Sequence, residues 1–167
     1  MTNLATLKEF ARHKDGTYVS MDLRDDCRAL LDNFVEMNLG LTERVDPSTY
    51  HITIIYSRAP VPSAEQIAGL TTDTEATAIG YEVFPTKNDG KCLVMRLQFN
   101  FAEMMNAKLT DEGATSDYHH YKAHLTLAYD MTQEVNPTTL PLPQFKLKFG
   151  PIKVAPLDPT YTPENKK

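Results

Sequence analysis

The 167-residue chain has no tryptophan, only two cysteines and no apolar stretch long enough to span a bilayer. Two cysteines, Cys27 and Cys92, are too few for a disulfide framework or a ligand cluster, and each is expected to be a small buried hydrophobe in a reducing compartment. The N-terminal stretch lacks an apolar signal-peptide region. The sequence therefore predicts a cytoplasmic protein that does not contact a membrane.

Clusters of positive charge are also missing. The net charge is -5, and the only basic run is the pair Lys166 and Lys167. Binding to long nucleic acid depends on many lysines and arginines that displace counterions from phosphates, so a long nucleic-acid partner is not expected. The sequence also has no glycine-rich phosphate-binding loop. A nucleotide ligand, if there is one, should be small and held in a pocket.

Linkers and low-complexity tracts are absent as well. With 41% hydrophobic and 23% charged residues, the composition is that of an ordinary globule, and the length allows a core without disulfides or metals. We expect one domain over residues 1–167, and nothing in the sequence indicates an obligate protein partner.

Two short segments, residues 51–54 and 124–127, carry the same pattern of side chains. Both read His-x-Thr, and polar residues alternate with bulky aliphatic ones as in a half-buried strand. The polar face of the pair presents four side chains: His51, Thr53, His124 and Thr126. The opposite face carries the aliphatic residues that we expect in the core: Ile52, Ile54, Leu125 and Leu127.

The surroundings of these segments are duplicated too. A strand-like stretch (16–23) and a helical stretch (24–39) precede the first His-x-Thr segment, and a strand-like stretch (91–99) and a helical stretch (101–113) precede the second. The chain thus repeats strand, helix and His-x-Thr strand at supersecondary scale. Two half-sites related by a pseudo-twofold axis would face one another across a cleft.

The helical stretches have apolar stripes that we expect to face the core. Leu30 is included in the first stripe and Met104 in the second. Asn100, followed by Glu103, predicts a capping box at the start of the second helix, and Ser63 predicts the N-cap of a short helix over residues 63–70.

The remaining segments give weaker patterns. Residues 3–13 have helical spacing, residues 74–86 favour a strand, and residues 87–90 form a hairpin turn rich in Asn, Asp and Gly. Near the C-terminus we expect two short strands, 145–149 and 152–154, around a turn at Gly150 and Pro151.

Two histidines on one face suit the cleavage of a ribonucleotide phosphodiester through its own 2'-hydroxyl. That reaction needs one proton removed from the attacking oxygen and one delivered to the leaving 5'-oxygen, and histidine titrates near neutral pH. His51 and His124 are the predicted acid and base, in an order that the sequence leaves open. Thr53 and Thr126 are placed to donate hydrogen bonds to the oxygens on which charge accumulates.

A metal ion is not expected to take part. His119 and His120 are adjacent, but only Asp117 lies near them as a further ligand type, which is too few for a metal site. The segment from 110 to 121 is instead expected to form a rim or lid over the groove. The sequence indicates no cofactor.

The paired His-x-Thr motif and its repeated flanks resemble the 2H phosphoesterase superfamily over about residues 16–130. Within it, GTYVSMDL, STYHITIIYS, YKAHLTLAYD and FGPIKVAPLD are most similar to the phage anti-CBASS phosphodiesterases, which degrade host cyclic-oligonucleotide signals. The resemblance implies an α+β, two-lobed fold in which duplicated strand-helix-strand units and antiparallel sheets line a central groove. It also implies a phage protein that acts in the infected cytoplasm on a cyclic di- or trinucleotide such as 3',3'-cyclic GMP-AMP.

Base recognition is the least constrained part of this prediction. Some relatives are said to stack a base on tryptophan, which this chain lacks, so Tyr18, Tyr118 or Tyr161 would have to take that role. Asp158 is a candidate acceptor for an exocyclic amine. The preferred bases, the ring size, the oligomeric state and the order of the 110–121 loop stay open.

Three alternatives remain beside cyclic-oligonucleotide cleavage. A related enzyme could open 2',3'-cyclic phosphates on RNA ends or cut 2'-5' oligoadenylates. A protein without turnover could act as a nucleotide sponge, although the presence of both His and both Thr residues argues against a dead site. A purely structural protein is the remaining option.

Overall fold

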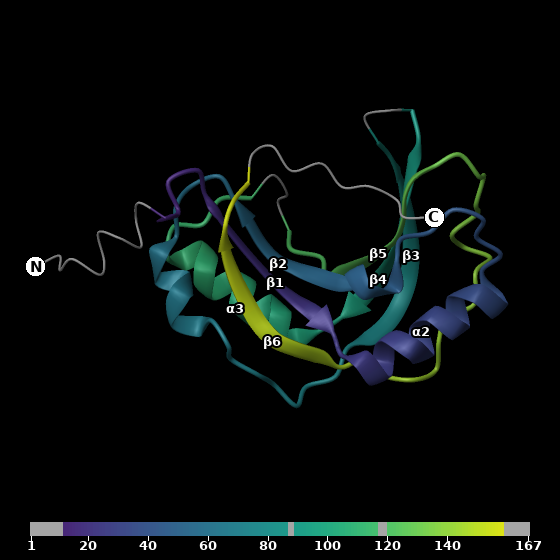
Figure 1. The fold of residues 1–167 in the computed structure, drawn as a ribbon, viewed down its shortest axis with the longest axis horizontal. Helices are drawn as coiled ribbons and strands as arrows, with labels where there is room; N and C mark the ends of the chain where they lie inside the picture. The colour runs from purple at the N-terminus through teal and green to yellow at the C-terminus, as the bar shows by residue number, and fades with distance from the viewer. Residues whose placement is uncertain (1–11, 87–88, 117–119, 159–167) are drawn as a thin grey trace, which may run out of the picture.

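The computed structural model describes residues 12–86, 89–116 and 120–158. Figure 1 shows the path of the chain. The elements are β1 (Thr17–Leu23), α2 (Asp25–Asn38), β2 (His51–Ser57), β3 (Thr77–Pro85), β4 (Lys91–Gln98), α3 (Asn100–Asp111), β5 (His124–Met131) and β6 (Phe149–Pro156). Two short 3-10 helices, Pro47–Thr49 and Pro62–Ile67, lie on either side of β2 in the chain.

The strands form one six-stranded sheet in the order β3-β4-β5-β2-β1-β6. Every neighbouring pair is antiparallel. The predicted repeat is confirmed, because β1-α2-β2 and β4-α3-β5 are matching strand-helix-strand units. In each half the His-x-Thr strand lies at the centre of the sheet, and the two central strands pair at Ile52 and Leu125. The α+β fold class is confirmed.

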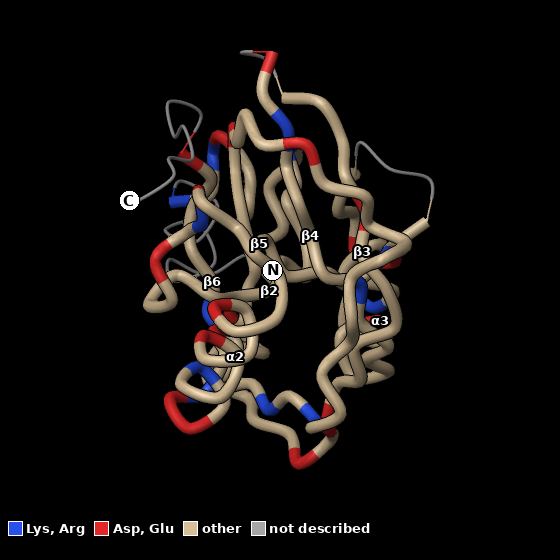
Figure 2. The backbone as a smooth tube through the Cα atoms, turned by 90° about the vertical axis from the view of Figure 1, so that its right-hand side faces the viewer, with Lys and Arg blue, Asp and Glu red and all other residues tan. Residues whose placement is uncertain are grey.

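The aliphatic residues of the His-x-Thr strands face the core, as predicted. Ile52, Leu125 and Leu127 are fully buried, and Ile54 is 1% exposed. Buried residues of both helices belong to the same cluster. Figure 2 shows α2 and α3 below the strands. Since their buried residues belong to the core cluster, the two helices cover the apolar face of the sheet.

The apolar stripes of the two helices are narrower than predicted. Leu30 is 52% exposed and Met104 is 62% exposed, so their assignment to the core was wrong. In α2 the buried residues are spaced four apart, at Cys27, Leu31 and Val35. Leu30 falls just outside this stripe, because a helix on a sheet buries only the side chains that point at the strands.

Both predicted caps were also wrong. Helix α3 begins at Asn100 itself with Phe99 at the N-cap position, where no side-chain hydrogen bond forms. Ser63 lies inside a 3-10 helix whose N-cap is Val61, and its hydroxyl donates to Glu112 instead, at 2.9 Å.

The predicted turn at Gly150 and Pro151 is absent, because β6 runs straight through both residues. Among the described strands, β6 pairs with β1 alone, at the edge of the sheet, and Ile152 also exchanges backbone hydrogen bonds with Gly69 and Leu70. An edge strand tolerates proline where the missing N–H is not needed for the ladder. The register shifts between Met21 and Leu23, which places two residues of β6 opposite one of β1. Gly150 and Pro151 therefore form a bulge in one strand.

The two cysteines, Cys27 and Cys92, are both buried and form no disulfide, as predicted.

Strands β3 and β4 pair as a hairpin, and the Thr86 N–H donates to the Gly90 carbonyl at 2.9 Å, while turn residues 87–88 lie outside the described residues. The predicted helix 3–13 lies almost entirely outside them. Within the described ranges, no helix is long and apolar enough to cross a membrane.

Candidate active site

The pairing of β2 with β5 brings the four predicted residues together on one face of the sheet. Because Ile52 is the partner of Leu125, the antiparallel register puts His51 beside Thr126 and Thr53 beside His124. All four side chains are partly exposed, whereas the residues between them are buried. Each threonine is thus a close neighbour of the histidine from the other half.

The two histidines are oriented by the same local contact. Nδ1 of His51 donates to the Thr49 carbonyl at 2.6 Å, and Nδ1 of His124 donates to the Lys122 carbonyl at 2.9 Å. A carbonyl oxygen only accepts, so the proton must be on Nδ1 in both rings. This tautomer leaves Nε2 of each ring to accept or deliver a proton.

Thr53 is held by two tyrosines. The Tyr18 hydroxyl lies 3.0 Å from Thr53 Oγ1, and the Tyr121 hydroxyl donates to the Thr53 carbonyl at 2.8 Å. Burial raises the pKa of Tyr121, so this donor keeps its proton. Tyr18 also makes an edge-on contact with Tyr56, with ring centroids 6.2 Å apart. The predicted binding residue Tyr18 therefore adjoins the first His-x-Thr motif.

Thr126 has a different partner. Its side chain interacts with the thiol of Cys92 on the neighbouring strand β4. Burial raises the pKa of Cys92 to about 11 and outweighs the lowering effect of Thr126 on that pKa, so the sulfur stays protonated at neutral pH. The two threonines are equivalent in the repeat but are supported by unlike side chains, a phenol on one side and a thiol on the other.

Two charged residues that the sequence analysis did not single out flank the histidines. Asp22 of β1 is directly opposite His51, and Arg96 of β4 is directly opposite His124. Each forms an ion pair with the next strand outward, Asp22 with Lys153 at 2.7 Å and Arg96 with Glu82.

The repeat itself carried the signal for these two residues. Asp22 stands in Met-Asp-Leu and Arg96 in Met-Arg-Leu, each in the strand that precedes a His-x-Thr segment. The flanking methionines and leucines are buried in both halves. A charge at the same place in two otherwise apolar strands marks the polar face.

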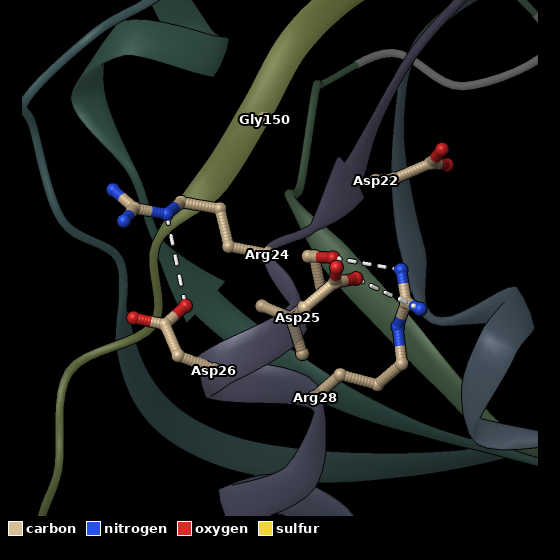
Figure 3. Close-up of a pocket in the computed structure, with 7 residues that line it drawn as sticks. Asp22, Arg24, Asp25, Asp26, Arg28 and Gly150 are labelled. Carbon is tan, nitrogen blue, oxygen red and sulfur yellow. Dashed lines mark hydrogen bonds and ion pairs between the residues drawn. The ribbon is translucent and has the colours of Figure 1, made fainter.

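A hollow of about 620 Å³ lies beside Asp22, at the end of β1. Its lining includes Asp22 and the start of α2, and Figure 3 shows Arg24 turned to Asp26 and Arg28 turned to Asp25. The carboxylates of Asp25 and Asp26 are therefore each compensated by a nearby arginine, and Asp22 connects the hollow to His51.

Of the other predicted binding residues, one lies near an end of the sheet and two fall outside the residues that the structure describes. Asp158 is exposed and follows the end of β6 that pairs with Thr17, so it lies toward the Tyr18 end of β1. Tyr118 and Tyr161 lie outside the described residues, as do Asp117 and His119. Within the described segments, no group of three or more His, Cys, Asp or Glu residues is arranged to hold a metal ion.

The fold is similar to that of E. coli LigT. A crystal structure of E. coli LigT complexed with NADP+ superposes with a TM-score of 0.50 at 15% identity, covering 83% of this chain and 95% of that one. At this identity the likeness concerns the fold alone.

The chain belongs to the family of the anti-CBASS protein Acb1, whose family model matches residues 15–164. The Acb1 of Vibrio phage KVP40 is 27% identical over 115 residues, which cover 69% of this chain and 73% of that protein. The Acb1 of Enterobacteria phage T4 is 28% identical over 126 residues, covering 75% and 79% respectively. The Acb1 of Escherichia phage RB16 is 33% identical over 104 residues, covering 62% and 57%.

Proposed function

We propose that the protein is a metal-independent phosphodiesterase that linearises cyclic di- or trinucleotides and so counteracts bacterial CBASS defence. The observation that supports this most directly is the single pair Ile52 and Leu125, which seats both His-x-Thr motifs on one face. Membership of the anti-CBASS family supports the biological role, and the net charge of -5 favours a small nucleotide over a long one.

The reaction uses the 2'-hydroxyl next to the scissile 3'-5' bond as the nucleophile. Nε2 of one histidine removes the hydroxyl proton while Nε2 of the other, protonated, delivers a proton to the leaving 5'-oxygen. The P–O5' bond breaks as the O2'–P bond forms, which gives a 2',3'-cyclic phosphate and a free 5'-hydroxyl. The hydroxyls of Thr53 and Thr126 donate to the non-bridging oxygens as charge accumulates on them.

Base recognition is proposed for the Tyr18 end of β1. Tyr18 already contacts Thr53, so a base stacked on its ring would adjoin the scissile phosphate. Asp158, beyond the end of β6, is the proposed acceptor for an exocyclic amine. Tyr118 and Tyr161 remain proposals from the sequence alone.

The experiment is chromatography of the products from a panel of cyclic di- and trinucleotides, with RNA ending in a 2',3'-cyclic phosphate and a 2'-5' oligoadenylate as competing substrates. We expect linear products from the cyclic substrates, undiminished activity in chelator, and no cleavage at a linkage whose 2'-hydroxyl is replaced by hydrogen. Loss of activity in chelator, or cleavage of the 2'-deoxy linkage, would contradict the mechanism. Recovery of intact ligand after heat denaturation would indicate a sponge.

A further inference from the structure

Arg96 is the counterpart of Asp22 in the second half of the repeat, but it is positively charged. The two residues occupy the same position in the two halves, each opposite a histidine of the candidate site. Their charges are opposite, so the flanks of the groove are not equivalent. Both charges are ion-paired, Asp22 with Lys153 and Arg96 with Glu82, but of the two only Arg96 has N–H donors to offer an anionic ligand.

The surroundings of Arg96 leave it available to a ligand. Its side chain is 22% exposed, so the guanidinium is neither sealed in the core nor free in solvent. Strand β3 places Gly80 directly opposite, and a Cβ added there would meet no atom within 4 Å. The face beside Arg96 is therefore open on its outer side.

The hydrogen bonds of Arg96 are incomplete. Glu82 takes one of the guanidinium nitrogens, but Nε is buried and has no partner among the described residues. An arginine carries five N–H donors in a planar fork that suits phosphate oxygens. An unmatched donor on a half-buried guanidinium is costly, and a ligand that reorients the side chain would remove this cost.

The position of the guanidinium determines which phosphate it can reach. The scissile phosphate is expected between β2 and β5, where the two histidines lie. Arg96 is one strand further out, and its ion pair with Glu82 draws it toward β3. Neighbouring strands are about 4.8 Å apart, so this group lies off the reacting centre and over a second part of the ligand.

We propose that Arg96 binds the phosphate that is not being cleaved, on the His124 side of the groove. This inference rests on the proposed function, since a cyclic dinucleotide carries a phosphate at each of its two linkages. Arg96 is thus a substrate-binding residue that favours cyclic ligands over ligands with a single phosphate, and Glu82 is the counter-ion that it releases when the ligand binds.

The test is a calorimetric titration with two uncleavable probes, a 2'-deoxy cyclic dinucleotide and the corresponding 2'-deoxy dinucleoside monophosphate, which has one phosphate. Arg96→Met is expected to weaken binding of the cyclic probe by about 10- to 100-fold, the effect of losing a charge-assisted hydrogen bond. Binding of the single-phosphate probe should change by less than about two-fold, and Arg96→Lys should be intermediate for the cyclic probe because it keeps the charge without the fork.

Two further variants separate ligand binding from a structural role. Glu82→Gln removes the competing carboxylate and should leave binding of the cyclic probe unchanged or tighter, whereas a purely structural ion pair would make it resemble Arg96→Met. Lys91→Met removes an ion-paired cation from the same strand, about 17 Å away at 3.4 Å per residue, and should have no effect on either probe.

Three results would overturn the proposal: equal weakening of both probes in Arg96→Met, no weakening of either, or failure of the wild-type protein to bind the cyclic probe. The proposed function fails separately. If the wild-type protein binds the cyclic probe in an Arg96-dependent way but does not cleave the ribose form, the catalytic proposal is wrong and the binding role of Arg96 stands.

Discussion

At the scale of single residues, the site depends on which atoms are left free to act. The Thr49 and Lys122 carbonyls hold the two Nδ1 protons, so both rings present Nε2. Thr53 and Thr126 carry the hydroxyls; Tyr18 contacts the first, and Cys92 lies near the second. The two halves of the repeat thus orient their histidines in the same way, but different side chains lie next to their threonines.

Replacing each threonine by valine removes the hydroxyl and keeps the shape. We expect Thr53→Val and Thr126→Val each to lower kcat by about 10²- to 10³-fold with little change in KM, since these donors act mainly on the charge that develops during the reaction. Steady-state kinetics on a cleavable cyclic dinucleotide measures this effect. Thr77→Val, on strand β3, is the matched control and should behave as the wild type; a wild-type kcat in both site variants would exclude the proposed role.

At the scale of elements, the sequence predicted best the segments in which polar and apolar side chains follow a regular pattern. The His-x-Thr strands, their partners and both helices are where the pattern put them, because burying every second side chain of a strand sets its register. The predictions failed where the outcome depends on packing that one segment cannot reveal. Leu30 and Met104 lie beside the stripes that contact the sheet, and Pro151 is accommodated because β6 is an edge strand.

The candidate site was predicted from the same alternation, but only in part. The motif residues were found because they recur, whereas Asp22 and Arg96 differ in charge and were not recognised as equivalents until the strand register placed each opposite a histidine. The contacts of Tyr121 and Cys92 depend on tertiary packing and had no local signal.

The contact between β2 and β5 gives a prediction at this scale. Ile52 and Leu125 are fully buried partners where the two halves of the sheet meet. Ile52→Ala or Leu125→Ala should lower the free energy of unfolding by about 2–5 kcal/mol, through lost burial and the cavity left behind. Leu30→Ala, at an exposed helical site, should change it by no more than about 0.5 kcal/mol. Chemical denaturation measures both, and equal effects at the two kinds of site would contradict the assignment of the core.

At the scale of the whole molecule, duplication explains how one chain forms a two-part candidate site. Each strand-helix-strand unit ends in a His-x-Thr strand, and the antiparallel meeting of these strands opposes the histidine of one half to the threonine of the other. The helices bury the apolar face and keep the central strands in register.

The most direct measurement is the turnover of a cyclic dinucleotide by His51→Ala, by His124→Ala and by the double variant, with thermal unfolding to confirm that each protein is folded. If both imidazoles act on one phosphate, each single variant should lose about 10²- to 10⁴-fold in kcat, and the double variant should lose less than the product of the two single losses. A folded single variant that turns over at the wild-type rate would contradict the account.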